Sequence, residues 1–152
     1  CLLSVYLKFI ILLKFSNLLL ASNQVNQSYG LNRNVSNAAL LDFFFKENVD
    51  PSAEELPGKK MGAAMTIQAL EAALALCKTS SPFEPEFLES EYRALAEKIQ
   101  MKPGQLFSPI RVAITGKKFA PPLFDTMSAL GQDRCITRME KAILTLKLSI
   151  IA

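Results

Sequence analysis

The segment Pro109–Gly131, PIRVAITGKKFAPPLFDTMSALG, gathers side chains that can bind an anion or a nucleobase. It places Arg111 in an apolar, helix-like run, follows it with Lys117 and Lys118, and then has two consecutive prolines before a second apolar run. An arginine guanidinium is a planar fork of paired donors, whereas a lysine ammonium is a compact point charge. Because arginine and protonated lysine act mainly as cationic hydrogen-bond donors, the chemistry that they suggest is binding.

The composition excludes the commonest catalytic sites. The sequence has no histidine, which rules out Ser–His–Asp triads and zinc hydrolase centres. Its cysteines are scattered and form no Cys-x-x-Cys pair, so we expect Cys77 and Cys135 to pack as small apolar residues. The run ITGKK lacks the first glycine of a phosphate-binding loop, because Arg111 occupies that position. We therefore expect no catalytic residue, metal site or cofactor in this chain.

Aromatic residues flank the basic and proline-rich loop. Pro121 and Pro122 have no N–H group and no capping residue before them, so Leu123 and Phe124 carry the first free amides of the helix that follows. An uncapped helix start beside lysines can accept a phosphate or a base oxygen. Phe119 and Phe124 offer flat faces on which unpaired bases can stack. The alternative is that the aromatic rings pack inside and the prolines form a turn that closes a helical bundle.

Charge is divided along the chain. Between Leu40 and Glu97 eleven acidic residues outnumber five basic ones, whereas between Lys98 and Ala152 nine basic residues outnumber three acidic ones. The division suggests an anionic partner for the second half, although the two halves could instead attract each other. The last helix has a basic ridge at i, i+4 and i+7, which on many helices is only a solvated surface. We predict a phosphate-binding set of Lys117, Lys118, Arg134 and Arg138.

The apolar spacing predicts an all-α helical bundle of five or more helices. Helices are expected over 65–78 and 85–100, the second of them ending at Lys102-Pro103-Gly104. Ser108 is the expected N-cap of a helix whose first residue is Pro109, and Gly116 is its expected C-terminal stop. In the last helix, 133–147, we expect the inward face to comprise Cys135, Ile136, Met139, Ile143 and Leu146.

The first part of the chain differs in composition from the rest. The chain begins at Cys1 rather than at Met, so we interpret it as a fragment or a processed product. Cys1–Ala21 is almost wholly apolar and could be a membrane anchor, a buried helix or foreign sequence. Ser22–Asn37 is polar and is expected to be a linker. We therefore divide the chain into an N-terminal segment and two helical subdomains, namely residues 1–37, 38–80 and 81–148.

The stretch LFSPIRVAITGKKFAPPLFDTMSALGQDRCITRMEKAI resembles the closing segment of bacterial-type glutamyl-tRNA synthetases. That family typically has Pro-Leu-Arg-x-Ala-Leu-Thr-Gly, a short loop, Pro-Pro-Leu-Phe, Leu-Leu-Gly and a final basic helix. DFFFKENVD and ALEAALAL are similar to further parts of the same family. The resemblance runs from about Leu40 to Lys147.

The resemblance implies the all-helical, α-helix-cage anticodon-binding region of a class I synthetase, whose whole enzyme joins glutamate to its tRNA with ATP and Mg²⁺. It implies tRNA(Glu) as partner, with tRNA(Gln) as a second candidate, and a cytoplasmic monomer that binds neither DNA nor a membrane. The family's His-x-Gly-His and Lys-x-Ser-Lys motifs are missing, so this chain is not expected to be active alone. The runner-up function is a helical protein-interaction module, tethered to a membrane or not. The matching anticodon-binding positions are Arg111, Ala120, Pro121, Pro122, Leu123 and Phe124.

Overall fold

The computed structural model describes residues 42–46, 48–58, 60–118 and 120–151, and within them it contains a short 3-10 helix and five α-helices but no strand. This confirms the predicted all-α class. The apolar segment and the linker that we predicted for residues 1–37 lie outside the described residues. Among the residues that are described, no helix has the length and apolar character needed to span a membrane. The helices are η1 (Asp42–Phe44), α3 (Ala63–Thr79), α4 (Pro85–Lys98), α5 (Pro103–Thr115), α6 (Leu123–Leu130) and α7 (Gln132–Ile151).

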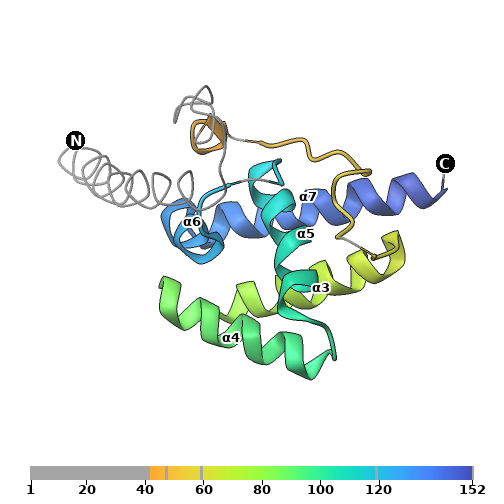
Figure 1. Cartoon of the computed structure of the whole chain (residues 1–152). Coiled ribbons are helices and arrows are strands. Elements are labelled where there is room, and N and C mark those ends of the chain that lie inside the picture. Colours follow the sequence, from red (N-terminus) through yellow and green to blue (C-terminus); the bar gives the residue numbers. More distant parts are fainter. Residues whose placement is uncertain (1–41, 47, 59, 119, 152) are drawn as a thin grey trace, which may run out of the picture.

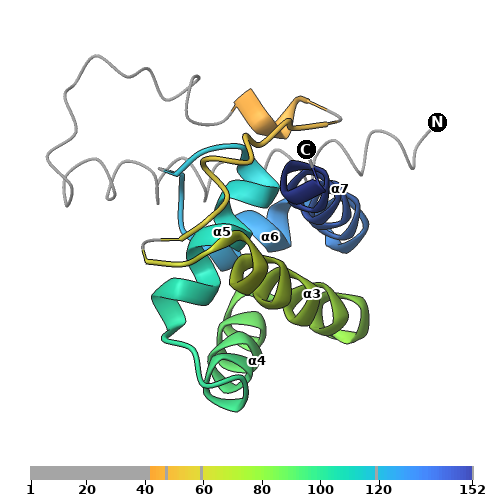
Figure 2. The ribbon, with the colours of Figure 1, turned by 90° about the vertical axis from the view of Figure 1, so that its right-hand side faces the viewer.

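The helices surround one shared core. α3 and α7 form the most extensive helix pair, and α5 crosses both of them (Figure 1). α4 contacts α3, α5 and α6, and it lies on the side of α3 that faces away from α7 (Figure 2). The short α6 joins the end of α5 to the start of α7. The domain division at residue 80 stays a prediction, but α3 packs against α5 and α7, which lie beyond that boundary.

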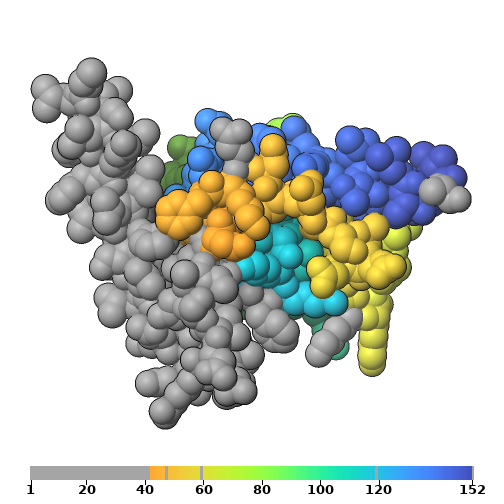
Figure 3. Space-filling view, turned by 90° about the horizontal axis from the view of Figure 1, so that it is seen from above, coloured from red at the N-terminus to blue at the C-terminus, as the bar shows by residue number. Residues whose placement is uncertain are grey.

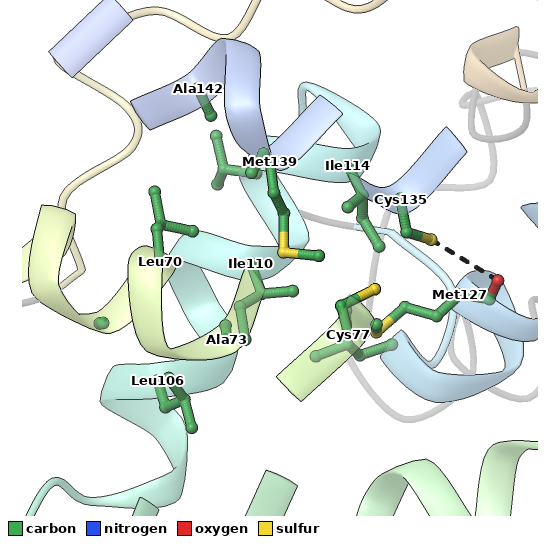
Figure 4. Packing of buried hydrophobic residues seen from close by; sticks show 14 of the residues in the cluster. Leu70, Ala73, Cys77, Leu106, Ile110, Ile114, Met127, Cys135, Met139 and Ala142 are labelled. Carbon is green, nitrogen blue, oxygen red and sulfur yellow. Dashed lines mark hydrogen bonds between the residues drawn. The ribbon is translucent and has the colours of Figure 1, made fainter. Parts of the chain in front are cut away.

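The core is built from the apolar stripes of α3, α4, α5, α6 and α7, and Figure 4 shows part of it. Both Cys77 and Cys135 are buried in it as free thiols, which confirms that they pack rather than react. Burial raises the pKa of the Cys77 thiol to about 11, so it stays protonated at neutral pH. The buried Tyr92 hydroxyl donates to the Ala73 carbonyl at 3.0 Å, which ties α4 to α3. Apart from Ile136, which is half-buried, the face of α7 predicted to be inward is buried.

The start of α5 differs from our prediction. We placed Pro109 at the first helical position, but the helix begins six residues earlier, at Pro103, and Pro109 lies inside it. α4 already ends at Lys98, so the tripeptide that we took as its end is the start of the next helix. Pro103 suits a first helical position because its missing N–H has no partner there in any case. The Gln105 side chain also accepts from the Lys102 amide at 3.2 Å.

The predicted stop of α5 at Gly116 is confirmed. Gly116 has φ 71°, a left-handed conformation that other residues rarely adopt, and its amide donates to the Val112 carbonyl at 2.8 Å. The buried Thr115 hydroxyl donates to the Arg111 carbonyl at 2.7 Å and accepts from the Lys117 amide at 3.1 Å. These bonds fix where the chain leaves the helix, and therefore where Lys117 begins.

Candidate nucleic-acid interface

Basic side chains from two distant parts of the chain converge on η1. η1 and the residues after it lie beside α7 and the end of α5 (Figure 3). Lys117, just past α5, forms an ion pair with Asp42, the first residue of η1, with 2.5 Å between Nζ and Oδ1. From α7, Arg134 donates to the Phe44 carbonyl at 3.1 Å. The structure therefore brings Lys117 and Arg134, two residues of the predicted phosphate-binding set, to opposite flanks of one short segment.

Arg138, a third member of that set, is buried, and its prediction as a phosphate-binding residue is wrong. Its side chain is 1 % exposed and donates to the carbonyls of Ile114, Phe43 and Lys46, at 2.6, 2.8 and 2.7 Å. The basic ridge that we predicted on α7 is therefore interrupted. Arg138 instead joins α7 to the last turn of α5 and to η1. A guanidinium suits this task because several donors leave one planar group in fixed directions.

Asp42 holds two ammonium groups at once. Its Oδ1 atom faces Lys117, and its Oδ2 atom lies 3.0 Å from the Nζ atom of Lys46, one helical turn later. The hydrogen bond from Lys117 is the main cause of the lowered pKa of Asp42, and the bond from Lys46 acts in the same direction. Partial desolvation opposes both, so the carboxylate is stabilised by its partners rather than by its position alone.

A hollow of about 350 Å³ opens between this segment and the end of α5. Its wall is about equally polar and apolar, and it includes two carboxylates and two ammonium groups. That volume lies near the lower end of the range for ligand pockets. The lining residues are Asp42, Phe43, Lys46, Asn48, Val49, Asp50, Thr115, Gly116 and Lys117.

The start of α6 has no side-chain cap, as we predicted. The side chains there are less accessible than expected, however. The Phe124 ring is 8 % exposed and packs against Tyr92 and Phe107, with ring centroids 5.8 and 5.1 Å away. Our expectation that a base stacks on Phe124 is therefore wrong, because the ring belongs to the core. Leu123 is buried as well, while Ala120 and Pro122 are half-buried.

The surface around the start of α6 is acidic. A second hollow, of about 550 Å³, is lined by Pro85, Phe124 and four carboxylate residues, namely Glu84, Glu86, Glu89 and Asp125. Negative charge near a helix start competes with an incoming phosphate for the same amides. Phosphate binding is therefore disfavoured at α6, and the basic groups around η1 are the better place for it.

The two remaining cationic candidates lie near the end of α5. Arg111 is half-buried on α5, one helical turn before Thr115, and Lys118 is exposed just after the helix. Phe119 lies outside the described residues, so its predicted stacking role stays a prediction. Among the described residues, no group of three or more His, Cys, Asp and Glu side chains is placed to hold a metal ion.

The acidic and basic halves of the chain attract each other directly. Lys147 pairs with Glu71 at 2.7 Å, Lys141 pairs with Asp50, and Lys117 pairs with Asp42. A fourth pair, Lys78 with Glu140 at 2.8 Å, has the opposite polarity. The charge division is thus used partly within the molecule, which is the alternative that we kept open. The acidic partners of these three basic residues are on η1, on α3 and in the loop between them.

Comparison with known proteins identifies the family. A family model described as an anticodon binding domain matches residues 36–143. The chain belongs to the anticodon-binding domain family. This confirms the fold and the family that the sequence motifs predicted.

The anticodon-binding domain is similar to parts of several glutamate–tRNA ligases. It is 48 % identical over 104 residues to the enzyme of Roseiflexus castenholzii (strain DSM 13941 / HLO8) and 52 % identical over 103 residues to that of Roseiflexus sp. (strain RS-1). Each match covers 68 % of this chain and 20 % of the relative, so the chain spans about a fifth of the length of these curated relatives.

A solved structure has the same fold. It is the crystal structure of a glutamate tRNA ligase from Elizabethkingia meningosepticum CCUG26117 in complex with its amino acid, with a TM-score of 0.59 and 20 % sequence identity. The match covers 92 % of this chain and 31 % of the other. At 20 % identity, this similarity shows that the two proteins share a fold and nothing more.

Sequence reasoning missed the residues that hold η1 in place. Asp42 is 75 residues away from Lys117, and Arg138 is 95 residues away from Phe43, so no local spacing relates them. The sequence did contain one indication that Arg138 is buried. Cys135 and Ala142, which lie three residues before it and four residues after it, share its face of α7, and both are buried. The sequence itself holds no such signal for Asp42.

Proposed function

We propose that this domain binds the anticodon loop of a tRNA and forms part of a glutamate–tRNA ligase. The observation behind the proposal is the match of residues 36–143 to the anticodon-binding family, within which cationic side chains gather around η1 and the end of α5. RNA binding of this kind requires positioned donors and phosphate ligands, and it requires no catalytic residue.

Base recognition is assigned to Arg111 and to the loop that leads into α6. The resemblance aligns Arg111 and Ala120–Phe124 with the family's anticodon-contacting positions. Since the side chains of Leu123 and Phe124 are buried, their contribution would come from backbone groups and from the shape of the loop. Lys117, Lys118 and Arg134 would bind phosphates. Arg138 is left out of this set because it is buried.

The tRNA would be tRNA(Glu), with tRNA(Gln) as a second candidate, and the domain would act in the cytoplasm as a monomer. The ligation reaction with ATP and Mg²⁺ is proposed for the whole enzyme, of which the relatives' lengths leave about four fifths unmatched. The residues described here contribute to it by binding the RNA and orienting it.

Filter binding with two RNAs tests the proposal. One is a stem-loop with the glutamate anticodon, and the other differs by one anticodon base. A guanidinium that donates to a base edge discriminates by roughly 1–3 kcal/mol, so Arg111→Ala should narrow the ratio of the two affinities about 5- to 100-fold. Lys118→Ala should weaken both RNAs about equally, because an ammonium on a phosphate is indifferent to sequence.

Lys118→Ala is the matched control, because it removes one positive charge from the same region. An unchanged affinity ratio after Arg111→Ala would contradict the directed role of that arginine. Equal affinity of the wild type for both RNAs and for an unrelated hairpin would contradict anticodon recognition altogether.

A further inference from the structure

The ammonium group that we propose as a phosphate ligand at Lys117 is already bound to a carboxylate. The Lys117 Nζ atom lies 2.5 Å from Asp42 Oδ1, and the Lys117 side chain is 33 % exposed. An RNA phosphate that uses Lys117 therefore competes with the Asp42 carboxylate for the same ammonium group. The two anions cannot both occupy the near side of one ammonium group without strong mutual repulsion.

The position of Asp42 does not depend on its pairing with Lys117. Asp42 opens η1, and the carbonyls of Phe43 and Lys46 both accept bonds from the buried Arg138 guanidinium. Arg134 donates to the Phe44 carbonyl in addition. Backbone contacts thus hold the carboxylate against the end of α5, so it will stay nearby after Lys117 has turned to another anion.

Lys46 gives Asp42 a partner after such an exchange. Its ammonium lies 3.0 Å from Oδ2, the carboxylate oxygen that Lys117 does not use. When Lys117 moves to a phosphate, Asp42 keeps half of its charge compensation. All three side chains line the same hollow of about 350 Å³, which is far larger than a phosphodiester group. The exchange can therefore take place within one open site.

We propose that Asp42 is a specificity-determining residue that competes with RNA phosphate for Lys117. The proposal rests on the RNA-binding function proposed above. The competition lowers the affinity for every RNA that uses Lys117, so a bound RNA must make its remaining contacts well. A protein that discriminates among partners gains from such an intramolecular competitor, because general electrostatic attraction is reduced while directed contacts are kept.

A double-mutant cycle in the full 152-residue chain tests the competition, with an anticodon stem-loop RNA as the probe. Asp42→Asn keeps the shape of the side chain and removes its charge. It should tighten binding about two- to fivefold, which is the range expected for one partly exposed ion pair. Lys117→Ala should weaken binding. In the Lys117→Ala background, Asp42→Asn should tighten binding less than it does in the wild type, because the ligand for which Asp42 competes is gone and only the general effect of removing one negative charge remains.

Asp50→Asn is the matched control, since Asp50 lines the same hollow but pairs with Lys141. It should shift affinity equally with and without Lys117. Asp42→Asn overturns the inference if it tightens binding equally in both backgrounds, which would be long-range electrostatics, or if it leaves the wild-type affinity unchanged.

If the Asp42→Asn variant does not fold, a second double-mutant cycle with Lys46→Ala and Lys117→Ala tests the same inference. Lys46→Ala leaves Asp42 to Lys117 and should weaken RNA binding only when Lys117 is present. An equal effect in both backgrounds would overturn the inference. Suppose that the wild type binds RNA and Lys117→Ala weakens it, but the effects of the two substitutions add in both cycles. The proposed competition is then wrong, while the proposed RNA-binding function stands. If the wild type binds no RNA, the proposed function fails with it.

Discussion

At the scale of single residues, the four predicted phosphate ligands have four different environments. Lys118 is exposed, Lys117 is paired with Asp42, and Arg134 donates to a backbone carbonyl at the surface. Arg138 is buried beneath η1. Their charges were evident from the sequence, but their environments depend on segments 75 to 95 residues away, which no helical spacing encodes. Binding residues were thus predictable as a group, and the role of each one required the fold.

The buried position of Arg138 predicts a large effect on stability. Arg138→Met would leave the carbonyls of Ile114, Phe43 and Lys46 without this donor, and each buried unsatisfied group costs about 1–3 kcal/mol. We expect a loss of roughly 3 kcal/mol or more in the free energy of unfolding, since charged donors lie at the upper end of that range. Urea denaturation followed by circular dichroism measures it.

Arg134→Met is the control for that experiment, because Arg134 has one exposed bond to the same segment. It should cost about 0.5 kcal/mol or less, as surface substitutions usually do. If the two substitutions had equal and small effects, Arg138 would be a surface residue in solution and its role as the anchor of η1 would be wrong.

At the scale of elements, the end of α5 was predicted better than its start. The stop of α5 at Gly116 was predicted because glycine is one of the few residues that adopt a left-handed backbone at little cost. Its start was misplaced because Pro103 and Pro109 both fit a first helical position locally. The burial of Leu106 and Pro109 decides between them, and burial depends on α3 and α7.

Gly116 provides a test of that stop. With φ 71°, any residue that has a Cβ atom is strained there by about 1–2 kcal/mol. A Cβ atom would meet Val49 Cβ at 3.6 Å, an ordinary contact, so the cost of Gly116→Ala comes from the backbone alone. We expect Gly116→Ala to lower the free energy of unfolding by about 1 kcal/mol and Gly116→Asn by less, because asparagine tolerates this conformation better.

Gly104 is the matched control for Gly116, because it lies in the first turn of α5 with open space around its Cα atom. Gly104→Ala should leave stability unchanged or raise it by up to about 1 kcal/mol, since alanine favours a helix. The measurement is the urea midpoint of each alanine variant. If the two midpoints shifted in the same direction, the role of Gly116 as the stop of α5 would be contradicted.

At the scale of the whole molecule, the charge division has two uses. Acidic and basic halves form ion pairs with each other, and we propose that some of the basic residues also bind an external anion. The division itself was visible in the sequence, and both uses were considered. Which acid meets which base was not predictable, because the pairs between the halves join residues 62 to 91 positions apart. The packing of α7 on α3 brings some of these pairs together, and the position of η1 beside the end of α5 brings Asp42 to Lys117.

This partition predicts how steeply RNA binding depends on salt. Of the nine basic residues between Lys98 and Ala152, Arg138 is buried, and Lys117, Lys141 and Lys147 pair with the acidic half. Four cations are proposed to meet RNA: Arg111, Lys117, Lys118 and Arg134. If three or four phosphates are engaged, log K should fall by about 3 per decade of salt, at about 0.7–0.9 per phosphate. Filter binding between about 20 and 200 mM NaCl gives the slope. A slope near zero would mean that phosphates are not bound, and one of about 5 would mean that Lys141 and Lys147 leave their acidic partners and bind phosphates as well.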